Sequence, residues 1–321
     1  VTVEEVLHPA GRVVVFGIPA RPKGTAYQWR GAYLMRSGSS LVPMSEDQLR
    51  RIFAEGAPDW LEEPAMHGLG EEDVVGLLDT QGMYDLLALD YPARRSAVIE
   101  RLRSERLIDD CQGALSIRRM GALLLGKDLT AFDSIARKRL RLVVYDGDSK
   151  LFTTLDHVFD QGYAVGFQAM VQFVMGQLPR NEAIKDALRV ETALVDQIVV
   201  RELLANALIH QDFREAGTSP LVEVYDDRVE FSNPGDPIVP LDRFIDGYQS
   251  RNERMADLMR RMRICEEKSS GIDKVISSIE SFQLPAPRFS TSFGRTEVVV
   301  FGGKPFEQMD RDERVRAAYQ H

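Results

Sequence analysis

The stretch Arg201 to Phe213, RELLANALIHQDF, limits what this chain can fold into more than any other part of the sequence. Residues four apart in a helix lie one turn apart on the same face. Glu202, Asn206 and His210 therefore form one polar stripe, while the leucines and alanines between them can face a core. The helix needs a packed face and a polar face, and the polar face lines either a ligand site or a solvated surface.

The polar stripe carries side chains that suit a site for a metal and a nucleotide. An amide such as Asn206 supplies a hard oxygen ligand for Mg²⁺. A carboxylate one turn earlier, such as Glu202, can orient or deprotonate a water. The alternative is a partly solvated helix face, and the helix alone leaves both interpretations open.

The sequence around this helix predicts an α+β domain over residues 127–301. Its strands are expected in RKRLRLVVYDG, LVEVYD and RVEFSNPG and in two closing segments near 288–301. Helices are expected over 166–178, 191–209 and 253–263 and in SSGIDKVISSIESF. Helices on one side of a mixed sheet form an α+β sandwich.

These segments carry a resemblance to a known family. RELLANALIHQDF, VEVYDDRVEFSNPG and ICEEKSSGIDKVI follow one another as they do in the RecG-like C-terminal ATPase domain. That domain is a branch of the GHKL group, the ATP-binding fold of gyrase, Hsp90 and histidine kinases, whose first motif is a helical E-x-x-x-N. The resemblance implies ATP and Mg²⁺ as cofactors, Glu202 as catalytic base, Asn206 as metal ligand, and a nucleotide-binding set of Asn206, His210, Asn233, Gly235, Ser270 and Gly271.

Two departures from the family pattern bear on the chemistry. The second GHKL motif is D-x-G, but the matching residues here are Asn233, Pro234 and Gly235, and an asparagine oxygen accepts a hydrogen bond without charge. The glycine-rich lid over the phosphates is reduced to KSSG, residues 268–271, at a helix start whose backbone N–H groups can hold an anion. We therefore expect nucleotide binding with at most slow, Mg²⁺-dependent hydrolysis of ATP.

GALLLGKD, residues 121–128, resembles a phosphate-binding P-loop in all but its last position. The motif G-x-x-x-x-G-K-[ST] requires a hydroxyl for Mg²⁺ where this sequence has Asp128, and the motif must follow a strand and open a helix. A carboxylate beside phosphates and the apolar ALLL both argue against phosphate binding. The chain is therefore not expected to be a P-loop helicase.

Residues 73–126 have the element order of a winged helix. Three short helices are expected in VVGLLDT, GMYDLLAL and ARRSAVIERLRSERL, followed by a hairpin in IDDCQGALSI. Arg94, Arg95 and Arg101 make the third helix a candidate for contacts with DNA phosphates. Glutamates alternate with these arginines, which favours the alternative of a solvated helix in a connector domain.

Residues 1–55 are expected to form strand, loop, strand, loop and helix, and residues 56–72 a linker. The element GAYLMRSGSS is similar to a motif in the second half of an AlbA-like domain of the Schlafen type. The other half, which carries the acidic residues of the nucleases in that family, does not occur in this sequence, so no nuclease activity is assigned. Arg36 is a candidate contact with nucleic-acid phosphate, although we favour a hydrogen-bonded turn.

Composition bounds the class of protein. Of 321 residues, 44% are hydrophobic and 28% are charged, as in soluble globular proteins, and no apolar run is long enough to span a membrane. Cys111 and Cys265 lack the spacing of a disulfide framework or a zinc site, so we expect reduced thiols and a cytoplasmic protein. The net charge of −9 argues against a chain coated in nucleic acid, but an acidic average can hide a local basic patch.

Both ends of the sequence indicate a fragment of a longer protein. The sequence starts with Val1, inside an apolar pattern. Residues 302–321 contain RDERVRAAYQH, which we expect to be the first helix of a truncated C-terminal winged helix, with Asp310 as its N-cap.

The order of an AlbA-like domain, a GHKL-like domain and a winged helix is typical of proteins described as transcriptional regulators. We therefore expect a homo-oligomeric, DNA-binding regulator whose nucleotide-type domain senses a ligand or mediates dimerisation. The first alternative is an ATP-hydrolysing enzyme of DNA repair or phage defence. The second is a degenerate GHKL-like dimerisation module without a ligand.

Overall fold

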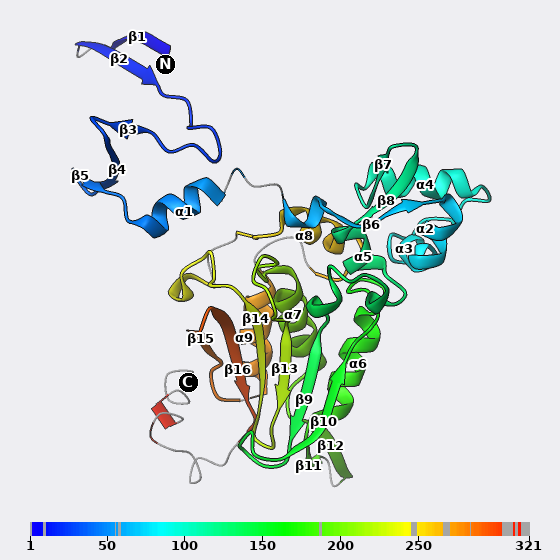
Figure 1. The fold of residues 1–321 in the computed structure, drawn as a ribbon. Coiled ribbons are helices and arrows are strands. Elements are labelled where there is room, and N and C mark those ends of the chain that lie inside the picture. Colours follow the sequence, from blue (N-terminus) through cyan, green and yellow to red (C-terminus); the bar gives the residue numbers. More distant parts are fainter. Residues whose placement is uncertain are drawn as a thin grey trace. The chain divides into compact units, whose positions relative to one another are not determined.

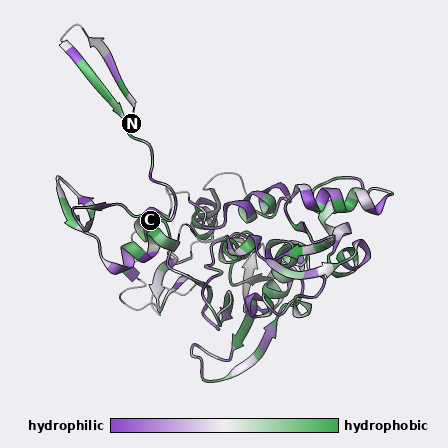
Figure 2. Cartoon of the chain, turned by 45° about the horizontal axis from the view of Figure 1, so that its top comes forward, coloured by the Kyte–Doolittle hydropathy of each residue, from purple (hydrophilic) through white to green (hydrophobic). Residues whose placement is uncertain are grey.

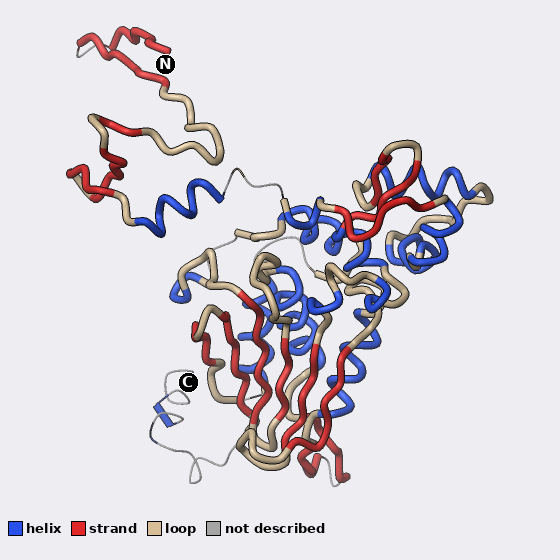
Figure 3. Tube along the Cα trace, viewed as in Figure 1, coloured by secondary structure: helices blue, strands red, loops and turns tan. Residues whose placement is uncertain are grey.

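The computed structural model of the chain describes residues 2–8, 11–54, 56, 59–185, 188–244, 249–265, 270–282, 284–303, 311 and 314–315. The chain has two compact units, residues 1–59 and residues 60–321. Figure 1 labels their elements and Figure 3 separates helices from strands. Because strands and helices occur in both units, the chain is an α+β protein, as the sequence predicts.

The first unit consists of short antiparallel strands and one helix. Its elements are β1 (Thr2–His8), β2 (Gly11–Gly17), β3 (Gln28–Trp29), β4 (Ala32–Ser37), β5 (Ser40–Pro43) and α1 (Glu46–Ala54). β1 pairs with β2, and β4 pairs with both β3 and β5. Phe53 of α1 meets the ring of Tyr33 on β4 edge to face, which ties the helix to its sheet. β2 is largely hydrophobic although it is exposed (Figure 2).

The predicted order of strand, strand and helix is confirmed by β2, β4 and α1. The composition of RSGSS predicts a loop, yet Ser37 ends β4 and Ser40 begins β5, which leaves only two residues for the turn. Gly38 in this turn has a φ of +61°, in the left-handed region that glycine adopts without strain. Composition alone cannot separate so tight a turn from a longer loop.

Residues 60–125 open the second unit with a small sheet and several helices. The elements are η1 (Trp60–Glu62), β6 (Pro64–Leu69), α2 (Glu71–Leu77), α3 (Thr80–Leu86), α4 (Arg95–Ser104), β7 (Ile108–Cys111), β8 (Ala114–Arg118) and α5 (Arg119–Leu125). The predicted three helices and hairpin occur in the predicted order. Gln112 and Gly113 form the hairpin turn with φ of +51° and +83°, as a two-residue turn between twisted strands requires.

The prediction of a linker over residues 56–72 is wrong, because part of this range forms a strand. Pro64–Leu69 form β6, which pairs antiparallel with β8 and places the strands in the order β6-β8-β7. The register shifts twice along this pair, so β6 shows no regular alternation of apolar residues. The partner lies far along the chain, which is why no local signal marks the strand.

The glycines of GALLLGKD serve packing. Gly121 lies inside α5, and a Cβ there would come within 2.4 Å of the Leu107 carbonyl oxygen. Asp128 follows the helix, and its carboxylate accepts from the Thr130 backbone N–H at 2.8 Å. Residues 119–125 thus form α5, whereas the P-loop motif requires a loop that opens a helix.

A six-stranded sheet forms the centre of the second unit, in the order β10-β9-β13-β14-β16-β15. The strands are β9 (Arg141–Tyr145), β10 (Thr153–Val158), β13 (Leu221–Val224), β14 (Arg228–Pro234), β15 (Arg288–Ser292) and β16 (Arg295–Phe301). Only β9 and β13 are parallel. Helices α6 (Phe167–Gln177), α7 (Gln197–Ile209) and α9 (Ser270–Ser281) lie on one face of the sheet (Figure 1). This is the predicted α+β arrangement.

The helix expected over 191–209 begins later than predicted. Leu188–Ala193 form β12, which pairs with β11 (Arg180–Lys185), and α7 starts at Gln197. Asp196 is the N-cap, and its carboxylate accepts from the Ile198 N–H at 3.4 Å. The alternation in LRVETA has the period of a strand, so the apolar residues of this segment belong to β12 and not to the helix.

The predicted helix over 253–263 is observed as α8 (Glu253–Arg261), and η4 (Leu241–Arg243) precedes it. Most of 302–321, including Asp310, lies outside the described residues, as do Lys268 and Ser269. Across the described parts of the chain, no helix combines the length and apolar composition that crossing a bilayer would need.

Candidate functional site

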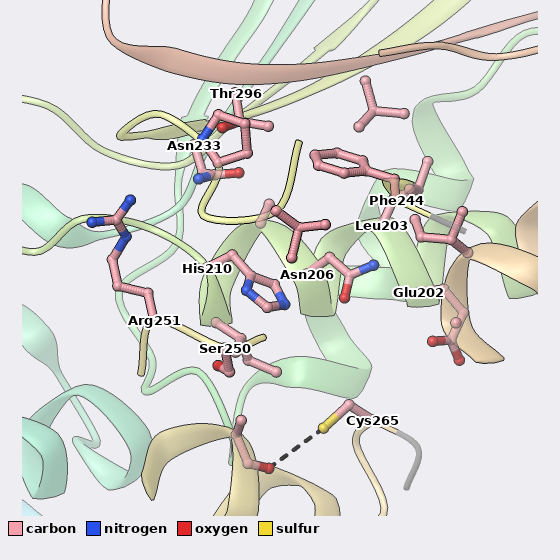
Figure 4. A pocket seen from close by; sticks show the side chains of 18 of the residues that line it. Glu202, Leu203, Asn206, His210, Asn233, Phe244, Ser250, Arg251, Cys265 and Thr296 are labelled. Carbon is pink, nitrogen blue, oxygen red and sulfur yellow. Dashed lines mark hydrogen bonds between the residues drawn. The ribbon is translucent and has the colours of Figure 1, made fainter. Parts of the chain in front are cut away.

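The polar stripe of α7 lines a cavity of about 170 Å³. Around it, the leucines, valines and alanines of the helix are buried in the core, as the apolar positions of the sequence predict. Glu202 is only 5% exposed, whereas Asn206 and His210 are half-buried. All three side chains extend from the same helix toward the cavity that Figure 4 shows. The stripe is therefore a cavity wall and not a solvated face.

Two other predicted segments reach the same cavity. Asn233, near the end of β14, and Gly271, in the first turn of α9, both line it. Gly271 lies so close to α7 that a Cβ on it would come within 2.9 Å of Glu202 Oε2. The structure thus brings Glu202, Asn206, His210, Asn233 and Gly271 together from three distant parts of the sequence.

Gly235 shapes the site without forming its wall. Its φ of +98° lies in a region that L side chains rarely adopt, and a Cβ there would come within 2.7 Å of Asp212 Cβ. Its N–H donates to the Gly294 carbonyl at 2.7 Å, and its carbonyl accepts from Thr296 Oγ1 at 2.8 Å. The glycine therefore allows the tight turn after β14. Ser270 begins α9, but its side chain lies outside what the structure describes.

Thr296 belongs to the site although no sequence motif marks it. It lines the cavity from β16, directly opposite Asn233 in the antiparallel pair with β14 (Figure 4). The side-chain amide of buried Asn233 donates to the Pro234 carbonyl at 3.3 Å. Only the register between two strands far apart in sequence reveals this pairing, so no local motif could have found Thr296.

Ser250 and Arg251 are further site residues that sequence reasoning missed. Both line the cavity just ahead of α8. Arg251 pairs with Asp212 at 2.8 Å and donates to the Asp236 carbonyl at 2.6 Å. Ser250 is 7% exposed, and its hydroxyl has no hydrogen-bond partner among the described residues. A buried hydroxyl without a partner is costly, so the cavity offers a bound ligand a hydrogen-bonding group.

Asn252 fixes the segment before α8 to the end of α7. Its side-chain amide donates to the carbonyls of Ile209 and Gln211 at 2.6 and 2.9 Å. These carbonyls lie where α7 ends, so the amide holds one edge of the cavity in place.

The electrostatics of the cavity favour neutral side chains at its base. Burial, together with the nearby charge of Arg251, lowers the pKa of His210 to about 4. Burial, together with Glu202, raises the pKa of Cys265 to about 11, and its Sγ lies 3.7 Å from the Ala256 carbonyl oxygen. His210 is therefore a neutral imidazole and Cys265 a neutral thiol near pH 7.

Apolar side chains form much of the remaining wall. They come from the sheet, from α7, α8 and α9, and from the stretch after β14, and comprise Leu203, Ala207, Ile209, Phe231, Pro237, Ile238, Val239, Phe244, Ala256, Ile272 and Val298. An apolar cavity with a few convergent polar groups is the usual form of a site for a small organic ligand.

The arginines predicted to contact nucleic acid lie elsewhere. Arg94 is the exposed N-cap of α4, and Arg95 lies 3.9 Å from Glu72. Arg101 pairs with Glu105 at 2.8 Å. Arg36 belongs to the first unit, where its Nε donates to the Gly38 carbonyl at 3.1 Å. The hydrogen-bonded turn that the sequence favours for Arg36 is thus present.

The sheet, the helices on one face and the cavity between them define a module of the ATPase type. Residues 217–300 match the family described as "Putative ATP-dependent DNA helicase recG C-terminal". The matched range holds Asn233, Gly235, Gly271 and Thr296, and α7 precedes it. The RecG-like ATPase-domain part of the resemblance is therefore supported.

A solved structure shares the fold. The crystal structure of the DIP2311 protein from Corynebacterium diphtheriae superposes with a TM-score of 0.60 at 17% sequence identity. The match covers 95% of this chain and 60% of that one, so the present chain spans little more than half the length of its structural relative. No curated protein matches the sequence.

Proposed function

We propose that the second unit binds ATP with Mg²⁺ in the α7 cavity, and that the chain is a DNA-binding regulator in which this cavity senses the nucleotide. The observation that carries the proposal is the convergence of three segments on one cavity: the α7 stripe, the end of β14 and the start of α9. The family match over 217–300 supports an ATPase-type module and is compatible with both cofactors.

The chain's own residues fit these cofactors. Asn233 presents an amide beside Thr296 at the base of the cavity, where its oxygen would accept from an adenine amino group. The unpartnered hydroxyl of Ser250 would gain a hydrogen bond from the same ligand. The described residues gather no cluster of three metal-binding side chains, so Asn206 would share Mg²⁺ with oxygens of the nucleotide, as is usual for this ion. Mg²⁺ would neutralise charge on the phosphates.

Binding is a better-supported role than fast turnover. Among the described residues that line the cavity, Glu202 is the one carboxylate, and a Cβ on Gly271 would come within 2.9 Å of its Oε2. A general base must reach the water that it activates, and the Glu202 side chain is only 5% exposed. The ATP-hydrolysing enzyme is the second candidate, and it rests on the position of Glu202 beside Asn206 on one helix face.

The DNA-binding part of the proposal rests on the middle of the chain. Three helices followed by a hairpin are the element order expected for a winged helix. Arg94 and Arg95 are exposed at the start of α4, where they could reach phosphates. The GAYLMRSGSS element of the first unit adds its resemblance to AlbA-like domains, which occur in regulators. Self-association is part of the same proposal. The ligand would act on the regulator by shifting an equilibrium between arrangements of its domains.

A titration with ATP, with and without Mg²⁺, tests the proposal. The wild type should gain thermal stability with MgATP, because a ligand that binds only the folded state stabilises it. Asn206→Ala should lose the Mg²⁺-dependent part, whereas Gln81→Ala, which removes an exposed amide on α3, should not. No stabilisation of the wild type at millimolar MgATP would reject nucleotide sensing. Phosphate release that depends on Glu202 would favour the enzyme.

A further inference from the structure

A chain of alternating charges runs from the wall of the α7 cavity to α4. Arg260 on α8 lines the cavity and pairs with Asp257 one turn earlier. Asp257 also accepts from Arg261 Nε at 3.2 Å. Arg261 donates twice to Glu105, at 2.9 and 2.5 Å, and Glu105 pairs with Arg101 at 2.8 Å. The chain therefore links a cavity residue to an arginine that the sequence marks as a candidate contact with DNA.

Glu105 is the carboxylate that joins the two helices. Its side chain is 11% exposed, and hydrogen bonds from Arg261 hold its pKa below the ordinary value, so it stays ionised. Arg261 donates to both of its oxygens, and Arg101 shares Oε1 with Arg261. The attraction between Glu105 and Arg101 thus depends on how firmly Arg261 is held by Asp257.

We propose that an anion bound in the α7 cavity strengthens the hold of Glu105 on Arg101 and thereby weakens binding of nucleic-acid phosphates at α4. An anion attracts Arg260 away from Asp257, and Asp257 then pairs more fully with Arg261. Arg261 gives up part of its contact with Glu105, which turns to Arg101. The inference rests on the proposed function, because it takes MgATP as the anion and DNA as the ligand of α4.

The effect is modest and works in both directions. Asp257 and Arg261 are 49% and 40% exposed, so solvent screens the links in the middle of the chain. We expect a change in DNA affinity of about fivefold, at the low end of allosteric couplings. Because coupling between two binding sites is reciprocal, DNA should weaken MgATP binding by the same factor. Added salt should reduce both effects.

The Nε–H signal of Arg101, followed by NMR in the full chain, tests the coupling directly. Adding MgATP should shift this signal in the wild type. Asp257→Asn breaks the middle of the chain and should abolish the shift. The matched control is Asp110→Asn, because Asp110 pairs with Arg103 of α4 and takes no part in the ion pairs that join the described residues of α8 to α4. A shift that survives Asp257→Asn would overturn the inference, as would an unmoved Arg101 signal while α7 amides respond to MgATP.

A variant that imitates the effect of the bound anion without any ligand separates failure of the coupling from failure of the proposed function. Arg260→Gln removes the first cation of the chain, as capture by an anion would, and should move the Arg101 signal in the direction that MgATP does. If α7 amides ignore MgATP, nucleotide sensing is rejected, and Arg260→Gln still decides the coupling. If Arg260→Gln does not move the Arg101 signal, the coupling is contradicted. In a titration with a DNA duplex, MgATP should lower the affinity of the wild type for DNA about fivefold and should not lower that of Asp257→Asn.

Discussion

His210 ends α7 with an imidazole that burial keeps neutral, since its pKa falls to about 4 from an ordinary 6.5. Above pH 6.5 the folded and unfolded chains are both neutral at this residue, and it contributes nothing to the pH dependence of stability. As the pH falls from 6.5 toward 4, the unfolded chain takes up a proton that the folded chain refuses. Stability is lost through this window, and the loss is complete below pH 4.

Replacing His210 should therefore flatten part of the acid limb of the stability profile. His210→Asn is expected to remove roughly 3 kcal/mol of the fall in unfolding free energy between pH 6.5 and 4. Urea unfolding at a series of pH values measures this. His67→Asn, at an exposed histidine on β6, is the matched control for the removal of an imidazole. Equal slopes for the wild type and His210→Asn would contradict a buried neutral imidazole.

Gly121 and Gly176 both lie in helices but should respond oppositely to alanine. A Cβ on Gly121 would come within 2.4 Å of the Leu107 carbonyl oxygen, a backbone atom, whereas a Cβ on Gly176 would meet nothing within 4 Å. Gly121→Ala should lower the free energy of unfolding by about 1 to 3 kcal/mol through overpacking. Gly176→Ala should raise it by about 0.5 to 1 kcal/mol, since alanine restricts the unfolded chain more than glycine does. Thermal unfolding of both variants tests the pair.

The residues of the site divide into those that local sequence can predict and those that it cannot. Glu202, Asn206 and His210 were predictable because a single helix sets their spacing. Thr296 and Ser250 were not, since their places depend on strand register and on the path of a loop. Asn233 and Gly271 were found only through a family resemblance, which supplies the distant contacts that a periodic pattern lacks.

Among the elements, η1 joins residues 60–126 of the second unit to residues 127–301. Trp60 stacks on Phe213 with ring centroids 5.2 Å apart, and the guanidinium of Arg119 lies 4.4 Å from the centre of the Trp60 ring. Phe213 follows α7 closely, so this stack touches the segment that leaves the cavity. Glu62 in the same short helix pairs with Arg118 at 3.5 Å and with Arg254 of α8. One turn of chain thus connects α5, α7 and α8.

Removing the Trp60 ring should cost about 3 kcal/mol of unfolding free energy, because both stacked partners lose their contact surface. Trp29→Ala is the matched control, since Trp29 is 65% exposed in the first unit. Denaturant unfolding should show a lower midpoint for Trp60→Ala only. If the two tryptophan variants behave alike, the stack does not hold the second unit together.

Elements with a strong internal period were predictable, and elements that need a distant partner were not. α4 and α8 follow from their own sequences, and the hairpin of β7 and β8 follows from its turn. β6 reads as a linker because its pairing with β8 supplies the order that its composition lacks. β12 and α7 read as one helix because only Leu194, Val195 and Asp196 separate them, and the apolar Leu194 and Val195 suit either period.

At the scale of the whole molecule, residues 60–126 and 127–301 share one buried core. Leu107 and Leu124 lie in the same apolar cluster as Val199 and Phe231. Backbone hydrogen bonds also join the parts, since the Tyr163 N–H donates to the Leu123 carbonyl at 2.7 Å. The sequence-based boundary near residue 127 thus falls within a single packed unit, whereas residues 1–59 form a unit of their own.

The shared core predicts how truncated chains unfold. A chain of residues 60–321 should unfold cooperatively at the temperature at which the second unit unfolds in the full chain. A chain of residues 127–321 should show no cooperative transition, because it exposes the apolar surface that α5 covers. Calorimetry of both truncations measures this. A sharp transition for 127–321 would show that the GHKL-like part is independent of the middle region.

The parallel pairing of β9 with β13 affects how the protein emerges from the ribosome. β9 can pair with β10 almost at once, but its other edge must wait for β13, since Leu221 pairs with Arg141 roughly 80 residues earlier. At a synthesis rate of about 5 to 20 residues per second, that edge stays open for roughly 4 to 16 seconds. An open edge is a template for pairing with another strand. Nascent chains of this protein are therefore expected to engage chaperones while α6 and α7 are being made.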